Sequence, residues 1–214
     1  MKTLLFCLTL FYTVAASANE PVLKADGLYR LLSNMHLVND IPYKKDSYQA
    51  LVEIPAGTTA KWEVNHKTGH LEWEFKNSKP RNVKFLGYPG NYGFIPQTIL
   101  DKSEGGDGDP LDVIILGTAQ DKGSVSEVKI IGAIKLLDRG EQDDKIIAIP
   151  SHGAFQNIDT LGEMMVKFPG AIEIIRYWFE GYKGDKIQFM GYMEHKEAKE
   201  LIEKAHESWS KHNK

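Results

Sequence analysis

Three aspartates lie within six residues in the stretch GGDGDPLDVIIL, at positions Asp107, Asp109 and Asp112. The first two are two residues apart, so their side chains point to the same side of an extended chain. Asp112 has the opposite parity and can join them only if the chain bends at the intervening glycine or proline. Three converging carboxylates repel one another unless cations compensate the charge. Because hard divalent ions such as Mg²⁺ prefer oxygen ligands, the spacing favours a metal site.

Besides a magnesium site, this stretch could be an ordinary solvated turn or an EF-hand calcium loop. Solvated turn aspartates are common, and Asp-Gly and Asp-Pro pairs also mark ordinary turns, so this alternative stays open. An EF-hand calcium loop is excluded, because the twelfth position counted from Asp107 is Thr118 rather than glutamate.

Further charges lie at the ends or on the polar faces of other predicted strands. They are Glu53, Lys61, Glu63, Asp138, Asp143 and Lys145. Charges of both signs, spread over several strands, indicate a polar cavity with acids for metal and bases for an anion. A phosphate chelated to magnesium is a ligand that requires both.

These side chains must be positioned by a sheet, since apolar runs and period-two alternation dominate the first three quarters of the chain. Strands are predicted at residues 48–55, 111–117, 125–138 and 145–151, with a hairpin over residues 60–75. Residues 83–96, broken by glycine and proline, are predicted as a loop-rich connection, and residues 19–45 as an arm or an initial helix. Strands at this spacing predict an antiparallel barrel.

The last quarter of the chain changes to helical spacing. A helix is predicted within residues 157–183, with Asp159 as N-cap and a break at Pro169-Gly170. An amphipathic helix is predicted from residue 193 to the end. Strands first and helices later indicate an α+β fold, an antiparallel, OB-like β-barrel with helices packed outside, mainly C-terminal.

The N-terminus has the composition of a signal peptide. Lys2 precedes an apolar run over residues 4–14, and Ala16-Ser17-Ala18 fits the small-x-small cleavage rule. We expect cleavage after Ala18, a single domain over residues 19–214, and an exported protein, periplasmic or secreted. A buried N-terminal helix is the alternative. The net charge of −3 argues against a nucleic-acid partner, and no membrane association is expected after cleavage.

The motif D-G-D-P-x-D-V-[IL] is preceded by Y-P-x-N-Y-G and followed by D-x-G-E-x-D-x-K. Together these motifs resemble the soluble family I inorganic pyrophosphatases, from VEIP through WFEGYK. The resemblance implies Mg²⁺-dependent hydrolysis of pyrophosphate to two phosphates by direct attack of a metal-activated water. It also implies several Mg²⁺ ions, with Mn²⁺ or Zn²⁺ as possible substitutes, and a homo-oligomer; the predicted long loops favour a dimer.

The resemblance also implies a role for each matching residue. The implied metal ligands are Glu63, Asp107, Asp112, Asp138 and Asp143, and the implied general base is Asp109. The implied substrate-binding residues are Lys61, Arg81, Tyr92, Lys145, Tyr182 and Lys183, with Glu53 and Tyr88 in support. Arg139 departs from the acidic residue of the family at this position and places a positive charge beside Asp138. The histidines have no zinc-type spacing and are predicted at the surface.

Two rival functions remain. An exported β-barrel that binds divalent cations or phosphate without turnover would keep the acids but would need no base among them. An enzyme of broader range, a polyphosphatase or nucleotidase, would require a platform for a base or for a longer chain. Phosphate release from pyrophosphate, ATP and tripolyphosphate distinguishes all three functions.

Overall fold

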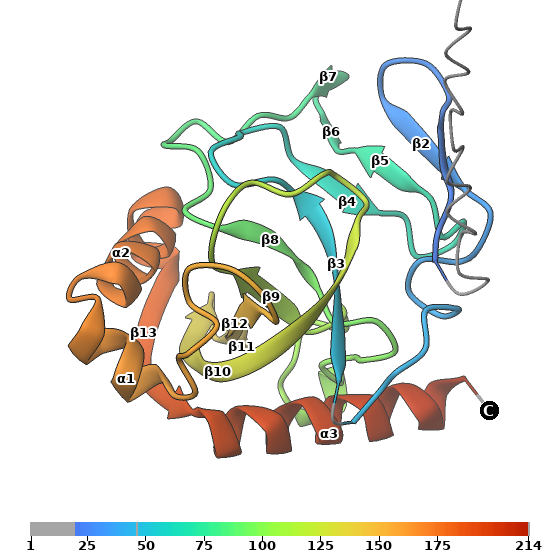
Figure 1. The fold of residues 1–214 in the computed structure, drawn as a ribbon. Coiled ribbons are helices and arrows are strands. Elements are labelled where there is room, and N and C mark those ends of the chain that lie inside the picture. Colours follow the sequence, from blue (N-terminus) through green and yellow to red (C-terminus); the bar gives the residue numbers. More distant parts are fainter. Residues whose placement is uncertain (1–19, 46, 214) are drawn as a thin grey trace, which may run out of the picture.

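The computed structural model describes residues 20–45 and 47–213, and the predicted signal peptide of residues 1–18 lies outside the described residues. Five strands close into a barrel (Figure 1). In order around the barrel they are β3 (Tyr48–Ile54), β8 (Asn91–Phe94), β9 (Asp112–Ile115), β12 (Lys145–Pro150) and β10 (Val125–Asp138), which pairs back with β3. The predicted barrel is confirmed, although β9 and β12 are parallel rather than antiparallel.

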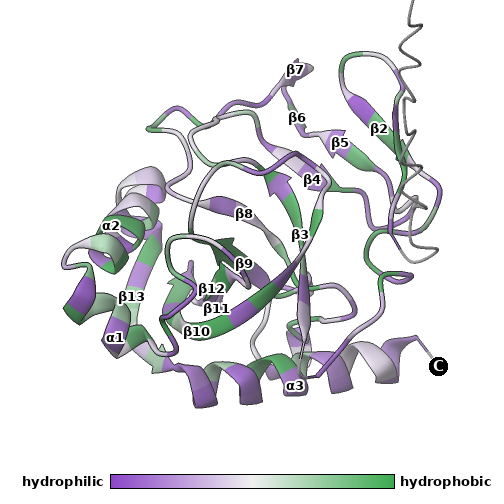
Figure 2. Ribbon diagram, viewed as in Figure 1, coloured by the Kyte–Doolittle hydropathy of each residue, from purple (hydrophilic) through white to green (hydrophobic). Residues whose placement is uncertain are grey.

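Both faces of the barrel strands are buried, which explains their continuous apolar runs. Along β9, Val113 and Ile115 belong to a cluster with Ile202 of α3 (His195–His212). Ile114, between them, belongs to a second cluster with Ile175 of α2 (Ala171–Lys183). In Figure 2 the central strands are accordingly rich in apolar residues, while α3 alternates between polar and apolar positions as it crosses the barrel. Burial on both sides stabilises the strands that position the charged groups.

A second sheet covers one side of the barrel. Its order is β1 (Leu23–Ala25), β2 (Arg30–Ser33), β5 (Leu71–Trp73) and β4 (Trp62–Val64). The predicted hairpin is present, since Glu63 lies opposite Glu72 in antiparallel register. The described part of the predicted arm or initial helix, residues 20–45, contains the strands β1 and β2 and no helix. A small hairpin of β6 (Phe75–Lys76) and β7 (Lys79–Pro80) extends from this sheet.

The C-terminal part differs from the predictions in detail. The helix α1 (Leu161–Lys167) begins after Thr160, whose hydroxyl accepts from the Glu163 N–H, so Thr160 rather than Asp159 is the N-cap. The predicted break at Pro169-Gly170 separates α1 from α2. The 3₁₀ turn η2 (Gly184–Lys186) then leads into β13 (Ile187–Glu194), a strand that was not predicted and that pairs with β10.

Residues 83–96, predicted as loop-rich, contain β8, which lies between β3 and β9 in the barrel. Gly93 is required there, because a Cβ at this position would lie 1.7 Å from the carbonyl oxygen of Leu51. Two short elements complete the fold, the 3₁₀ turn η1 (Lys102–Glu104) and β11 (Glu141–Gln142) at the edge of β10. Among the described residues, no helix is both long and apolar enough to span a bilayer.

Candidate active site

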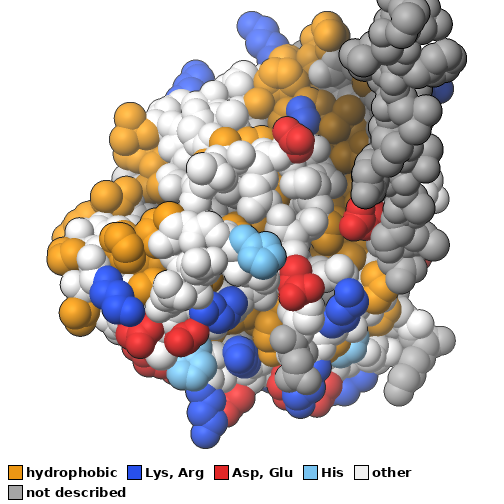
Figure 3. All heavy atoms as spheres, viewed as in Figure 1, with side chains coloured by type: hydrophobic (Ala, Val, Ile, Leu, Met, Phe, Trp, Pro, Cys, Tyr) orange, Lys and Arg blue, Asp and Glu red, His pale blue; other side chains and the backbone are white. Residues whose placement is uncertain are grey.

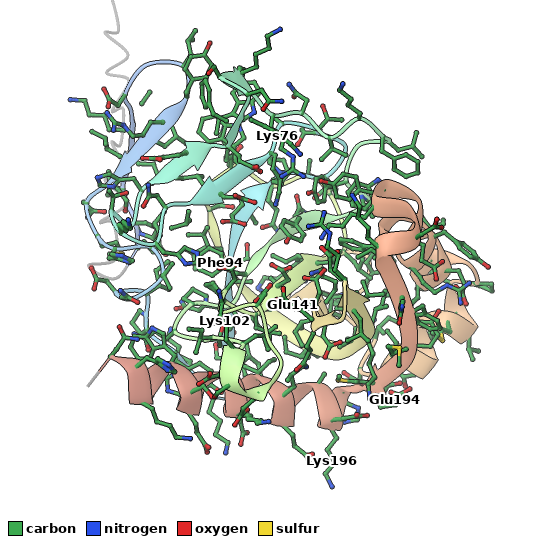
Figure 4. All side chains as sticks on the ribbon, turned by 180° about the vertical axis from the view of Figure 1, so that it is seen from behind. Lys76, Phe94, Lys102, Glu141, Glu194 and Lys196 are labelled. Atoms are coloured by element: carbon green, nitrogen blue, oxygen red, sulfur yellow. The ribbon has the colours of Figure 1, made fainter. Side chains whose placement is uncertain are left out.

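A cavity of about 540 Å³ lies where β9, β10, β12 and α2 carry charged side chains at their ends. All fourteen residues to which the family resemblance assigns a role line this cavity. Figure 4 shows two further lining residues, Phe94 and Glu141, near the middle of the molecule, with Lys102 close by. Residues spread over about 130 positions of sequence therefore meet in one place, from Glu53 to Lys183. Their individual chemical roles stay predictions.

The aspartate loop, residues 105–112, bends as the sequence requires. Gly108 has φ +86°, a left-handed conformation that glycine adopts without strain. The Asp109 N–H donates to Asp107 Oδ1 at 2.9 Å, which closes a tight turn. Leu100 holds the turn on both sides, since its carbonyl accepts from the Gly108 N–H at 2.8 Å and its own N–H donates to the Asp109 carbonyl at 2.9 Å. Asp112 then begins β9.

The acidic turn, residues 138–145, faces the aspartate loop. Lys145 is buried, and its ammonium group contacts both Asp112 and Asp143. Lys183, at the end of α2, lies 2.6 Å from Asp138 Oδ2 and 3.6 Å from Asp143 Oδ2. Burial raises the pKa of Asp143, but the attraction of these two lysines outweighs it, so that the pKa lies below its ordinary value.

Glu53, Lys61 and Glu63 form the side of the cavity next to β4. The pairing of β3 with β8 is irregular at Glu53, and this bulge accompanies a carboxylate in an otherwise apolar strand. Glu53 Oε1 accepts from the Val64 N–H at 2.7 Å, and burial raises the pKa of Glu53 to about 8. Lys61 Nζ lies 2.7 Å from Glu63 Oε1. Burial opposes the charge of Lys61, yet Tyr88, Glu63 and Glu53 together raise its pKa above the ordinary value.

Aromatic side chains and one arginine complete the lining. Arg81 donates to the hydroxyl of Tyr182 and to Glu74, so its guanidinium is held between two elements far apart in the sequence. The rings of Tyr88 and Tyr92 lie 5.0 Å apart. Burial raises the pKa of Tyr88 to about 12 and that of Tyr92 well above its ordinary value, so both phenols stay protonated near neutral pH and can donate hydrogen bonds.

The charge balance of the cavity fits divalent cations. Eight carboxylates line it, against four lysine and arginine side chains. Burial, reinforced by repulsion from neighbouring aspartates, raises the pKa of Asp107 to about 6, and burial likewise raises that of Asp109. Asp138 Oδ1 and Asp143 Oδ2 are buried without a hydrogen bond. Excess negative charge and buried acceptor oxygens suit a hard metal ion.

Within residues 20–45 and 47–213, no three acidic, histidine or cysteine side chains already converge on a common metal position. The reason is visible at the acidic turn, where Lys145 and Lys183 lie among the carboxylates and compensate part of their charge. The donor set therefore fits divalent metal, with protein cations in contact with the same oxygens.

Sequence reasoning missed several lining residues, notably His66, Glu141, Gln142 and Phe179. His66, predicted only as a surface residue, is exposed, but its Nδ1 lies 3.8 Å from Asp109 Oδ1 at the cavity mouth. No local pattern marks His66, because it lies in the turn that follows β4. Arg139 is exposed with φ +55° and does not line the cavity.

The family model described as inorganic pyrophosphatase matches residues 50–210. This chain belongs to the inorganic pyrophosphatase family. The crystal structure of the type I inorganic pyrophosphatase from Toxoplasma gondii is similar with a TM-score of 0.83 and 26% identity, over 90% of this chain and 98% of that one. The α+β barrel with C-terminal helices is thus the fold of known pyrophosphatases.

Curated pyrophosphatases are also similar in sequence. Inorganic pyrophosphatase 2, mitochondrial, from Mus musculus is 36% identical over 203 residues, which cover 80% of this chain and 61% of the relative. The Drosophila melanogaster inorganic pyrophosphatase is 36% identical over 172 residues, covering 72% of this chain and 50% of the relative. This pyrophosphatase-family chain therefore spans between half and two thirds of the length of these two relatives.

The prediction of an exported protein is wrong. The similar pyrophosphatases from Mus musculus and Saccharomyces cerevisiae are named as mitochondrial proteins, which contradicts a periplasmic or secreted location. Soluble vacuolar pyrophosphatases occur among the similar structures. The expectation depended only on the charge, hydrophobicity and small residues of residues 1–18.

Proposed function

We propose that this chain hydrolyses inorganic pyrophosphate to two phosphates and that it depends on divalent metal, in general Mg²⁺. The single observation that supports this most is the cavity that combines the aspartate loop, the acidic turn and four cationic side chains. Acids to hold metal and bases to hold phosphoryl oxygens are the two requirements of a metal-chelated phosphate.

In this proposal the carboxylates of Glu63, Asp107, Asp112, Asp138 and Asp143 hold several Mg²⁺ ions. Bound divalent ions lower the pKa of a coordinated water from about 15.7 toward about 7 and draw charge from phosphoryl oxygens. The buried oxygens of Asp138 and Asp143 that accept no hydrogen bond support this assignment, because a cation could occupy the place of the missing donor. The raised pKa of Asp107 also supports it, because burial and neighbouring aspartates make its charged form unfavourable without a cation. Mn²⁺ and Zn²⁺ are the substitutes to be tested.

Side chains of the protein accept the proton of the attacking water and stabilise the charge of the substrate. Asp109, exposed at the cavity mouth, accepts the proton of the attacking water. The water oxygen forms a bond to one phosphorus as the bond from that phosphorus to the bridging oxygen breaks, and no phosphoenzyme forms. The ammonium groups of Lys61, Lys145 and Lys183 stabilise the negative charge that develops on the departing phosphate.

The remaining lining groups orient the substrate. The ion pair of Arg81 with Glu74 and its contact with Tyr182 hold the guanidinium in one orientation toward the cavity, which suits a phosphoryl oxygen. The neutral hydroxyls of Tyr88 and Tyr92 can also donate hydrogen bonds that orient the substrate. Glu53, in support, fixes β4 through the Val64 N–H and thereby places Glu63.

Phosphate release from pyrophosphate, ATP and tripolyphosphate, with Mg²⁺ and then with a chelator, tests this proposal. We expect release from pyrophosphate with Mg²⁺ and its loss with the chelator. Binding of Mg²⁺ without any release would favour the non-enzymatic binding barrel. Comparable release from tripolyphosphate would favour the broader polyphosphatase.

We also propose that the chain forms homo-oligomers. Three large apolar side chains are exposed on α1 and α2, namely Val166, Ile174 and Tyr177. Figure 3 shows hydrophobic atoms gathered on the side of the molecule where these two helices lie. A second copy of the chain would remove such side chains from water. Light scattering combined with size exclusion measures the mass, and a monomeric mass at micromolar concentration would contradict the proposal.

A further inference from the structure

Asp144 is a buried carboxylate that the proposed chemistry does not use. It is 4% exposed and lies between Asp143 and Lys145, which both line the cavity, but it does not line the cavity itself. A buried carboxylate is costly unless its oxygens are hydrogen-bonded. Both oxygens of Asp144 are: Oδ1 accepts from the Leu136 N–H at 3.0 Å and Oδ2 from Gln142 Nε2 at 2.6 Å.

These two bonds fix the shape of the acidic turn. Leu136 belongs to β10, and its carbonyl also accepts from the Asp143 N–H at 3.0 Å. Leu136 is therefore bonded through both its backbone groups, to Asp143 and to the side chain of Asp144. Because Asp143 and Lys145 are the neighbours of Asp144 in sequence, holding its carboxylate restricts where both can lie.

The same carboxylate reaches the aspartate loop through Gln142. The Gln142 N–H donates to the carbonyl of Gly105 at 2.9 Å, and Gln142 pairs with Gly106 as an isolated bridge. Gly106 is closely packed, since a Cβ there would lie 2.6 Å from the carbonyl of Leu100. The register of Asp107 against the acidic turn thus depends on the position of Gln142, whose side chain Asp144 holds.

We infer that Asp144 is a positioning residue, which sets the separation of Asp107 and Asp143 through Gln142 and thereby the affinity of the cavity for Mg²⁺. The inference rests on the proposed function. Groups that orient metal ligands without touching the metal are worth about 10-fold to 100-fold in metal affinity.

The test measures Mg²⁺ binding by calorimetry at 25 °C, together with the free energy of unfolding in urea, on the full chain. Asp144→Ala removes both hydrogen bonds, and we expect the dissociation constant for Mg²⁺ to rise by about 10-fold to 100-fold. The matched control is Asp121→Ala, an exposed aspartate outside the cavity, which should leave Mg²⁺ binding unchanged.

A rescue variant separates positioning from charge. The double substitution Asp144→Asn with Gln142→Glu conserves the formal charge and reverses the donor and acceptor of the hydrogen bond between the two side chains. The introduced amide oxygen can still accept from the Leu136 N–H, so the double variant should recover most of the lost Mg²⁺ affinity. If Asp144→Ala does not fold, Gln142→Ala carries the test, because it breaks the link and leaves the Leu136 bond in place.

Two results would contradict the inference. The first is that Asp144→Ala, or Gln142→Ala in its place, lowers the free energy of unfolding while the folded variant binds Mg²⁺ as tightly as the unsubstituted chain. The second is that the double variant binds Mg²⁺ no better than Asp144→Ala. An unsubstituted chain that neither binds Mg²⁺ nor releases phosphate would instead overturn the proposed function, so the two failures are distinguishable.

Discussion

Lys145 and Asp112, 33 residues apart in the chain, form a partly buried ion pair between the parallel strands β12 and β9. The same ammonium group contacts Asp143, so one lysine joins the aspartate loop to the acidic turn. Lys145 is 2% exposed, and the attraction of the two carboxylates outweighs burial and raises its pKa. This lysine is therefore charged at neutral pH.

Replacing Lys145 by methionine should destabilise the metal-free protein by about 3–5 kcal/mol, because two largely buried carboxylates lose their partner. Saturating Mg²⁺ should reduce that loss, since the cation compensates the same charges. Urea unfolding with and without Mg²⁺ measures both. The control Lys135→Met, whose ion pair with Glu197 is exposed, should cost less than about 1 kcal/mol. An equal loss with and without Mg²⁺ would contradict the charge argument.

Asp112→Asn should abolish phosphate release from pyrophosphate with the fold intact. The substitution keeps the size of the side chain and removes the negative charge that the proposed metal site requires. Pyrophosphatase activity and the circular dichroism spectrum are the two measurements. Asp121→Asn, at an exposed position outside the cavity, is the matched control and should keep full activity. Full activity in Asp112→Asn would exclude the metal scheme.

Mg²⁺ affinity should fall as the pH is lowered through about 6. Burial, together with repulsion from neighbouring aspartates, raises the pKa of Asp107 to about 6, so protons compete with metal for this carboxylate below that pH. Calorimetric titrations from pH 5 to pH 8 would show the decline. In Asp107→Asn the affinity should be lower throughout and should vary less between pH 5 and 7. A pH-independent affinity in the unsubstituted chain would refute this.

Stability of the metal-free protein should decrease between about pH 6 and pH 8. Burial raises the pKa of Glu53 to about 8, so the folded state binds a proton that the unfolded state has already released, and the free energy of unfolding falls as the pH rises. Asp107 contributes in the same direction, but only up to its own pKa of about 6. The raised pKa of Lys61 adds a constant contribution here, because this lysine is protonated in both states below pH 8.

Glu53→Gln removes the carboxyl group whose titration lowers the stability, and it keeps a side-chain oxygen that can accept from the Val64 N–H. The slope of stability against pH between 6 and 8 should therefore flatten in this variant, as measured by urea unfolding in buffers with a chelator. Glu72→Gln on β5, whose carboxylate bonds Asn65 outside the cavity, is the comparison and should leave the slope in place. A slope retained in Glu53→Gln would assign the titration to another group.

Much of the strand content and the composition of the site could be predicted from the sequence, for two physical reasons. Period-two alternation and apolar runs report burial directly, and they located β3, β9, β10 and β12. Carboxylates crowded at Asp107 and Asp112 are unfavourable without a compensating cation, so their spacing alone indicates chemistry. The resemblance to a family then added Arg81 and Tyr182, whose types and local spacing carry no such signal.

Other features could not be predicted, because they depend on partners distant in the sequence. The strand β8 is short and interrupted by glycine, and it is stabilised by pairing with β3 and β9 rather than by its own propensity. The strand β13 is stabilised by its pairing with β10, which the local sequence does not reveal. The helix cap is Thr160 rather than Asp159, and the Asp159 carboxylate instead pairs with Lys129, 30 residues earlier in the chain.

The amino-acid sequence by itself determined which groups this protein brings to its chemistry, because alternation, turn residues and clustered charge are local properties of the chain. Only the tertiary structure decided which of them meet. Lys145 comes between Asp112 and Asp143, and Asp144 reaches the aspartate loop through Gln142, because barrel closure brings β9, β10 and β12 together. Contacts of this kind depend on strand order and register, which no local pattern of residues specifies.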